Sequence, residues 1–178
     1  MEQGSEQTTT ERDVPRVHIV DDDPRVLASL VAIVEQAGFV AAAHGDARSF
    51  LHSISDDEFA CVVLDMKLPG VEGLSLLRRL HERRDDLPVI MVSGEGDISS
   101  AIEALRCGAV DFLEKPVKPC DLIDRIVQAF NLAKGQRRRR QRADEIKHLI
   151  DGLTPREYEV MQKPVSYTHL TLPTNREV

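Results

Sequence analysis

The chain of 178 residues has few cysteines and no long apolar run. Its three cysteines are odd in number and form no C-x-x-C pair, so we expect reduced thiols, mostly buried as small apolar side chains. No stretch reaches the roughly 18 apolar residues that span a bilayer. The polar N-terminus lacks the apolar segment of a signal peptide. These absences argue against an integral membrane protein and predict a cytoplasmic one.

The composition is that of a folded domain with an appendage. Apolar residues make up 42% of the chain and charged residues 30%. Residues 1–15 are polar without apolar periodicity, and we predict that they are disordered. The net charge of −7 conceals a basic run at residues 137–142. We interpret this run as part of a solvated linker at 134–150, with binding to nucleic acid phosphates as the alternative.

Five short apolar runs alternate with amphipathic stretches. The runs lie at residues 17–20, 39–43, 61–64, 88–92 and 109–113. Their near-continuous apolar character predicts strands buried on both faces, as in a parallel sheet. The stretches between them predict helices with apolar stripes. The stripes comprise Leu27, Leu30, Val31 and Val34; Ala47, Phe50, Leu51 and Ile54; Ile98, Ala101, Ile102 and Leu105; and Leu122, Ile123, Ile126, Val127 and Phe130.

Two helix starts are marked by capping residues. Pro24 follows Asp23, and Asp97 precedes the stretch ISSAIEAL. Five strands that alternate with five helices predict an α/β domain whose sheet lies between two helix layers.

The residues that follow the strands are the informative ones, because ligands of open α/β sheets bind outside the carboxyl ends of the strands. These residues are Asp21, Asp22 and Asp23 after the first strand, Asp65 after the third, Ser93 after the fourth and Lys115 after the fifth. The sequence thus predicts that carboxylates, a hydroxyl and an ammonium group meet at one edge of the sheet.

These groups make chemical sense together. Clustered carboxylates repel one another unless a cation compensates, and hard oxygen ligands suit Mg²⁺. A carboxylate can act as a nucleophile and form an aspartyl phosphate, while Mg²⁺ and a lysine neutralise charge on the phosphoryl group. His18 and His44 show no pattern of metal ligands. The site therefore indicates phosphoryl transfer to an aspartate.

Four motifs, VDDDP, LDMKLPG, VSGEGD and FLEKP, resemble in order and spacing those of response-regulator receiver domains. The resemblance covers residues 16–133. It implies a flavodoxin-like (βα)5 fold with a five-stranded parallel sheet in the order 2-1-3-4-5. Within receivers, GEGD and AVDFLEKP are most similar to the FixJ/NarL branch, and LTPRE is similar to the opening of the LuxR-type helix-turn-helix domain that this branch carries.

The resemblance implies a metal site. Asp65 would accept the phosphoryl group, with Mg²⁺ as the cofactor. Asp22, Asp65 and the backbone carbonyl of Lys67 would bind the metal, and Asp21 would complete the acidic pocket without contacting the metal directly. The protein would be a phosphoacceptor in signalling rather than an enzyme.

The resemblance also implies a switch. Lys115 would contact the phosphoryl group, and Ser93 would supply the switch hydroxyl. Phe112 stands at the position of the aromatic switch residue, although an aromatic side chain on a strand fits a place in the core equally well. Asp23 fits the role of a helix cap better than that of a ligand.

The C-terminal part begins a second unit. Thr154, Pro155 and Glu157 form a helix-start pattern, and we interpret residues 151–163 as the truncated start of the helix-turn-helix. The ending VSYTHLTLPTNREV resembles the translation of a transposase adapter used in sequencing libraries. We therefore predict that residues 164–178 are a non-native tail, with a genuine short tail as the alternative.

Three function classes compete. The sequence favours a transcription regulator, in which a histidine kinase phosphorylates Asp65 and a phosphorylation-dependent homodimer binds promoter DNA through the complete helix-turn-helix. A stand-alone receiver, acting in a phosphorelay or as a protein-binding module, is the alternative. A phosphatase-like hydrolase ranks last, because that class generally has a second acid where Lys67 stands. No membrane partner is expected.

Overall fold

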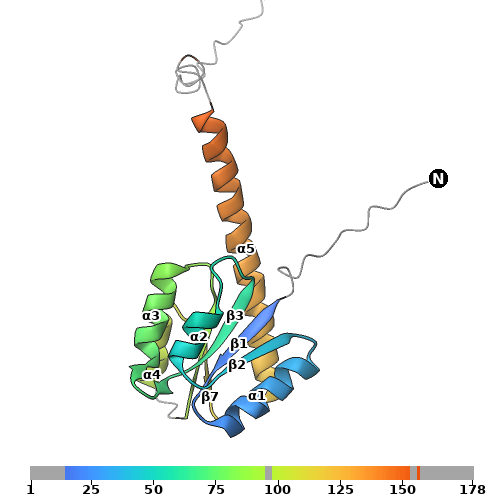
Figure 1. Cartoon of the computed structure of the whole chain (residues 1–178), viewed down its shortest axis with the longest axis vertical. Coiled ribbons are helices and arrows are strands. Elements are labelled where there is room, and N and C mark those ends of the chain that lie inside the picture. The colour runs from blue at the N-terminus through green and yellow to red at the C-terminus, as the bar shows by residue number, and fades with distance from the viewer. Residues whose placement is uncertain (1–14, 95–97, 153–155, 157–178) are drawn as a thin grey trace, which may run out of the picture. The chain divides into compact units, whose positions relative to one another are not determined.

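The computed structural model describes residues 15–94, 98–152 and 156. Its centre is a five-stranded parallel sheet in the order β2-β1-β3-β6-β7 (Figure 1). The strands are β1 (Arg16–Val20), β2 (Val40–His44), β3 (Ala60–Asp65), β6 (Val89–Ser93) and β7 (Asp111–Glu114). The predicted flavodoxin-like fold with strand order 2-1-3-4-5 is confirmed, β6 and β7 being the fourth and fifth strands of this sheet.

The described residues form five helices. They are α1 (Pro24–Gln36), α2 (Ala47–Ser53), α3 (Gly73–Arg83), α4 (Ile98–Arg106) and α5 (Pro119–Asp151). Helices α1 and α5 pack on one face of the sheet, and α2, α3 and α4 pack on the other (Figure 1). None of the helices described is both long and apolar enough to cross a membrane.

A small hairpin between β3 and α3 was not predicted. Its strands, β4 (Lys67–Leu68) and β5 (Val71–Glu72), pair antiparallel. Gly70 in the turn has a φ of 77°, a conformation that glycine adopts without steric cost. The letters LPG of the second motif, LDMKLPG, therefore form a tight turn shortly after β3.

The predicted start of α1 is confirmed. The Asp23 carboxylate accepts a hydrogen bond from the Arg25 N–H at 2.8 Å, and Pro24 occupies the first helical position. The other predicted start, Asp97, lies outside the described residues.

Alternate residues of the central strands enter two separate cores. Val20, Val62 and Leu64 pack towards α2 and α3, whereas Ile19 and Val63 pack towards α1 and α5. Because successive side chains of a strand point to opposite faces, a run that is apolar throughout supplies both cores. The prediction of strands buried on both faces is correct for β1, β3 and β6, apart from the first residue of β1.

That prediction is wrong for the edge strands. In β2 only His44 is buried and Val40 is 40% exposed, and no residue of β7 is fully buried. An edge strand has a neighbour on one side only, so helices cover it incompletely. Of the cysteines, Cys61 is buried as predicted, whereas Cys107 is half-buried and Cys120 is exposed.

The predicted core stripe of α4 is also wrong. Ile98, Ile102 and Leu105 are all exposed, and only Ala104 of this helix is buried. The stripe of the last helix is correct in its main contacts, but Val127 is exposed. Helical spacing identified an apolar face in α4 without showing what that face would contact.

Helix α5 continues through the predicted linker and ends at Asp151. The chain divides after Arg138 into two compact units. In the first, Phe130 of α5 stacks on Phe39 with ring centroids 5.5 Å apart and contacts Phe59 at 5.3 Å. In the second, the described side chains of α5 are exposed except for half-buried Ile150.

Two buried histidines, on the neighbouring strands β1 and β2, contact each other on the face of the sheet that α2 covers. His18 Nδ1 lies 3.0 Å from His44 Nε2, and His18 Nε2 lies 3.2 Å from a carboxylate oxygen of Glu58. Phe50 packs edge-on against both rings. Burial lowers the pKa of both histidines, and it lowers that of His44 to about 4 even though Glu58 works in the opposite direction. Both rings are therefore neutral near pH 7.

We predict that acid destabilises the protein through this pair. Below pH 6.5 His44 binds a proton in the unfolded chain but not in the folded one. The free energy of unfolding is therefore highest above pH 6.5 and falls as the pH approaches 4. At pH 5 the loss from His44 is about 2 kcal/mol. Urea denaturation at pH 7.5 and pH 5 should show a smaller difference for His44→Gln than for the wild type. The exposed control His52→Gln should behave like the wild type, and an unchanged difference in His44→Gln would contradict the prediction.

Helix α3 begins in close contact with the end of β3. A Cβ atom on Gly73 would collide with the Asp65 carbonyl oxygen and lie 2.9 Å from Met66 Cα. The Gly73 N–H also donates a hydrogen bond to the Met66 carbonyl at 3.0 Å. The turn that follows Asp65 thus leaves no room for a side chain at this position.

We predict that Gly73→Ala is destabilising by about 1–3 kcal/mol, because the atoms in the way belong to the backbone and cannot rotate aside. Gly45→Ala is the matched control, since nothing lies within 4 Å of its added Cβ. The urea midpoint should fall for the first variant and hardly change for the second. Equal midpoints would show that the turn relaxes at little cost.

Candidate functional site

The carboxyl ends of the strands bring the predicted residues to one edge of the sheet. Asp21 follows β1, Asp65 ends β3, Ser93 ends β6 and Lys115 follows β7. The Lys115 N–H donates to the Ser93 carbonyl at 2.8 Å, so the loop after β7 is fastened to the end of β6. The predicted convergence is present.

Three carboxylates gather at this edge. Oxygen atoms of Asp21, Asp22 and Asp65 all lie within 4.8 Å of one another. Asp21 and Asp65 are buried, whereas Asp22 is exposed. The Asp23 N–H donates to the Asp21 carboxylate at 3.0 Å and fixes its orientation. Asp23 itself caps α1, as predicted, and is absent from the cluster.

One ammonium group joins two of these carboxylates. Lys115 Nζ lies 2.6 Å from an oxygen of Asp21 and 3.3 Å from an oxygen of Asp65. The lysine lies 94 residues after Asp21 in the sequence. Its charge compensates part of the repulsion between the carboxylates.

Burial and charge act in opposite directions at this site. Burial raises the pKa of Asp65 and the charge of Asp21 raises it further, while Lys115 and a backbone hydrogen bond from Lys67 lower it; the net direction is upward. Burial acts to lower the pKa of Lys115, but its bond to Asp21 and the charges of both aspartates raise it overall. The lysine is therefore held firmly in its charged form.

The donor set fits a divalent cation. Three carboxylates against one ammonium group leave an excess of negative charge, and oxygen donors with an exposed member suit Mg²⁺, which retains several waters. The exposed Asp22 gives access from solvent. The described residues include no other group of three or more acidic, histidine or cysteine side chains so arranged.

Phe112 lies on β7 and is half-buried against the core beside α2, α3 and α4. This position is compatible with both interpretations of the residue, as part of the core and as a movable aromatic. Lys67 begins the hairpin after β3, with its side chain exposed. In the loop directly after Ser93, the structure describes Gly94 but not residues 95–97.

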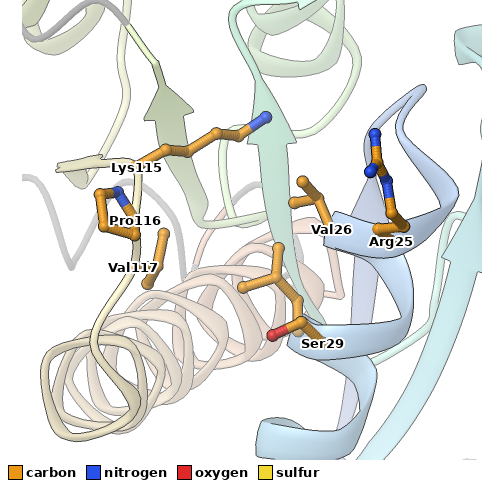
Figure 2. Close-up of a pocket in the computed structure, with 7 residues that line it drawn as sticks. Arg25, Val26, Ser29, Lys115, Pro116 and Val117 are labelled. Carbon is orange, nitrogen blue, oxygen red and sulfur yellow. The ribbon is translucent and has the colours of Figure 1, made fainter.

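A pocket of about 430 Å³ opens beside Lys115. Figure 2 shows Pro116 and Val117 on one side and Val26 and Ser29 of α1 on the other. Its lining is mainly apolar, with the cationic side chains of Arg25 and Lys115 at its border.

Two features of the site were not found from the sequence. The apolar pocket joins α1 to the loop after β7, and no local pattern links these segments. Gly73 is visible in the sequence as a glycine eight residues after Asp65, at the start of a helix. The requirement for glycine at this position, however, depends on how closely α3 approaches β3.

Comparisons with known proteins agree with this geometry. The family described as the response regulator receiver domain matches residues 17–127. Transcriptional regulatory protein FixJ of Bradyrhizobium diazoefficiens is 35% identical over 146 residues, covering 82% of this chain and 71% of that protein. Response regulator protein TodT of Pseudomonas putida is also 35% identical over 146 residues, covering 82% of this chain and 64% of that protein.

Solved structures show the same fold. The low-resolution structure of response regulator StyR has a TM-score of 0.76 at 34% identity and covers 83% of this chain and 75% of that one. A CheY-like receiver domain protein from Methanospirillum hungatei has a TM-score of 0.63 at 32% identity, covering 69% and 98%. The beryllofluoride-activated NtrC4 receiver domain dimer has a TM-score of 0.62 at 31% identity, covering 66% and 98%. The chain belongs to the family of response-regulator receiver domains of two-component systems.

Proposed function

We propose that Asp65 accepts a phosphoryl group from a histidine kinase. The observation that carries this proposal is the Lys115 ammonium group bound to Asp21 and Asp65 where three carboxylates converge. An Asp65 oxygen attacks the phosphorus of a phosphohistidine, the P–N bond breaks, and the electron pair leaves with the imidazole. The product is an acyl phosphate on Asp65.

Mg²⁺ is the proposed cofactor. Asp22, Asp65 and the backbone carbonyl of Lys67 would hold it, with Asp21 behind them. When bound, the ion neutralises charge on the phosphoryl group and on the carboxylates. Asp21 is positioned for a supporting role because its two oxygens are already engaged, one by the Asp23 N–H and one by Lys115.

The proposed switch follows phosphorylation. Lys115 and the Ser93 hydroxyl bind phosphoryl oxygens, which draws the ends of β6 and β7 towards Asp65. Phe112 on β7 responds to that movement. Such a change shifts an equilibrium between two existing conformations. A direct link supports the coupling, because the Lys115 N–H already binds the Ser93 carbonyl.

A partner protein fits the surface beside the site. The pocket next to Lys115 has an apolar lining from Val26, Leu30 and Val117, suited to an apolar side chain of the kinase domain that presents the phosphohistidine. Arg25 at the border suits an acidic neighbour. A kinase reaction of this kind takes place in the cytoplasm, which is the proposed location.

The proposed output is control of transcription. FixJ is a transcriptional regulatory protein, and this chain covers 71% of its length and 64% of TodT. We propose a receiver at 16–133, a linker at 134–150 and the truncated start of a DNA-binding helix-turn-helix at 151–163, followed by a non-native tail at 164–178. The complete domain would bind promoter DNA. A stand-alone receiver remains the alternative, and reading the gene past codon 163 from unfragmented DNA distinguishes the two.

Phosphorylation would favour a homodimer. The exposed stripe of Ile98, Ile102 and Leu105 on α4 supplies apolar surface near the loop after β6, where the switch acts. A dimer would place two DNA-binding domains on paired half-sites.

We predict that Asp65→Asn abolishes phosphorylation. The wild type incubated with acetyl phosphate and Mg²⁺ should gain the mass of one phosphoryl group, and Asp65→Asn, which keeps the shape but removes the nucleophile, should gain none. Intact-mass spectrometry measures both. Equal labelling of the two proteins, or no labelling of a folded wild type, would refute the assignment.

We predict that Asp22→Ala weakens the binding of the Mg²⁺ on which phosphorylation depends. Losing one carboxylate should raise the Mg²⁺ concentration for half-maximal labelling by about tenfold or more, the scale that even supporting contacts contribute to a metal site. Asp23→Asn is the matched control, because Asn can still cap α1. A titration in which both variants match the wild type would place the metal elsewhere.

A further inference from the structure

Helix α5 presents a dense group of arginines. We name Arg139, Arg140 and Arg142 the arginine group; all three side chains are exposed. Arg137, earlier in the helix, is half-buried and donates to the Asp57 carbonyl at 3.1 Å. Among the described residues, Arg139 and Arg142 have no ion-pair partner. Exposed guanidinium groups can contact a partner from solvent.

The charged residues in this part of α5 all have the same sign. Residues 134–142 carry six positive charges and no acidic residue, in a chain whose net charge is −7. Like charges three and four positions apart destabilise a helix by a few tenths of a kcal/mol per pair. An anionic partner would relieve that repulsion.

The charge density of this segment is close to that of duplex DNA. At 1.5 Å per residue, six charges over these nine residues amount to one per roughly 2 Å of helix axis. Duplex DNA carries one phosphate charge per about 1.7 Å of its axis. Arginine, which supplies five of the six charges, binds phosphate through a planar two-pronged contact that lysine lacks.

We propose that the arginine group binds the phosphate backbone of duplex DNA without regard to sequence. The contact is additional to any reading of bases by a helix-turn-helix and does not depend on phosphorylation of Asp65. Successive residues of an α-helix are rotated by about 100° around its axis. Arg139, Arg140 and Arg142 therefore lie within less than half of the helix circumference. The three guanidinium groups can therefore face one duplex together.

A membrane surface is a poorer partner for this segment. A helix that lies in a lipid interface needs an apolar face opposite its charges. Residues 134–142 contain no large apolar side chain.

The test measures binding of the 178-residue chain to a fluorescent duplex of about 20 base pairs of random sequence, by anisotropy at several salt concentrations. Three phosphate contacts predict that affinity falls about 40-fold between roughly 50 and 200 mM salt. The variant Arg139→Gln/Arg140→Gln/Arg142→Gln should lose this binding. The control Arg48→Gln/Arg79→Gln/Arg106→Gln removes the same charge from exposed sites elsewhere and should retain it.

Circular dichroism first checks that both variants keep their helix content. Asp65→Asn should bind the duplex as the wild type does, so failure of the phosphoacceptor proposal would leave this result unaffected. Absence of binding at low salt, or equal loss in both triple variants, would overturn the inference. Binding to anionic phosphatidylglycerol vesicles without binding to the duplex would also overturn it, in favour of a membrane.

Discussion

The ion pairs of Lys115 with Asp21 and Asp65 are the interaction on which the site depends. Three carboxylates at one sheet edge, two of them buried, would repel one another and take up protons if no cation lay between them. The lysine comes from the loop after β7, and its partners come from β1 and β3. One side chain therefore compensates charge and holds together the ends of three segments.

The scaffold makes this arrangement possible by placing every loop of the site at a strand end. Parallel strands with helical crossovers put all their carboxyl ends at one edge. Asp23 ties this edge to α1, because it caps the helix while its N–H holds the Asp21 carboxylate. Gly73 allows α3 to start against the Asp65 backbone. Close contacts with α1 and α3 surround Asp21 and Asp65, while Asp22 is exposed and a pocket opens beside Lys115.

The chain contains one acidic region and one basic region, and we propose a phosphate ligand for each. The acidic edge suits a cation and, through it, a phosphoryl group. The arginine group suits phosphates that are already part of a polymer. In both regions one sign of charge is in excess: three carboxylates meet one ammonium group at the acidic edge, and Arg139 and Arg142 have no ion-pair partner among the described residues.

Sequence patterns were enough to predict the α/β fold and the placement of Asp21, Asp65 and Lys115 at strand ends, and family resemblance supplied the strand order. A local pattern is sufficient for these features, because an apolar run ends where its strand ends. The parallel topology then places the carboxyl ends of all the strands at one edge of the sheet. Three features became visible only in three dimensions: His18 contacts His44, the apolar stripe of α4 is exposed, and a pocket lies between α1 and the loop after β7. Each depends on distances between elements far apart in the chain, and such distances are set by packing rather than by local pattern.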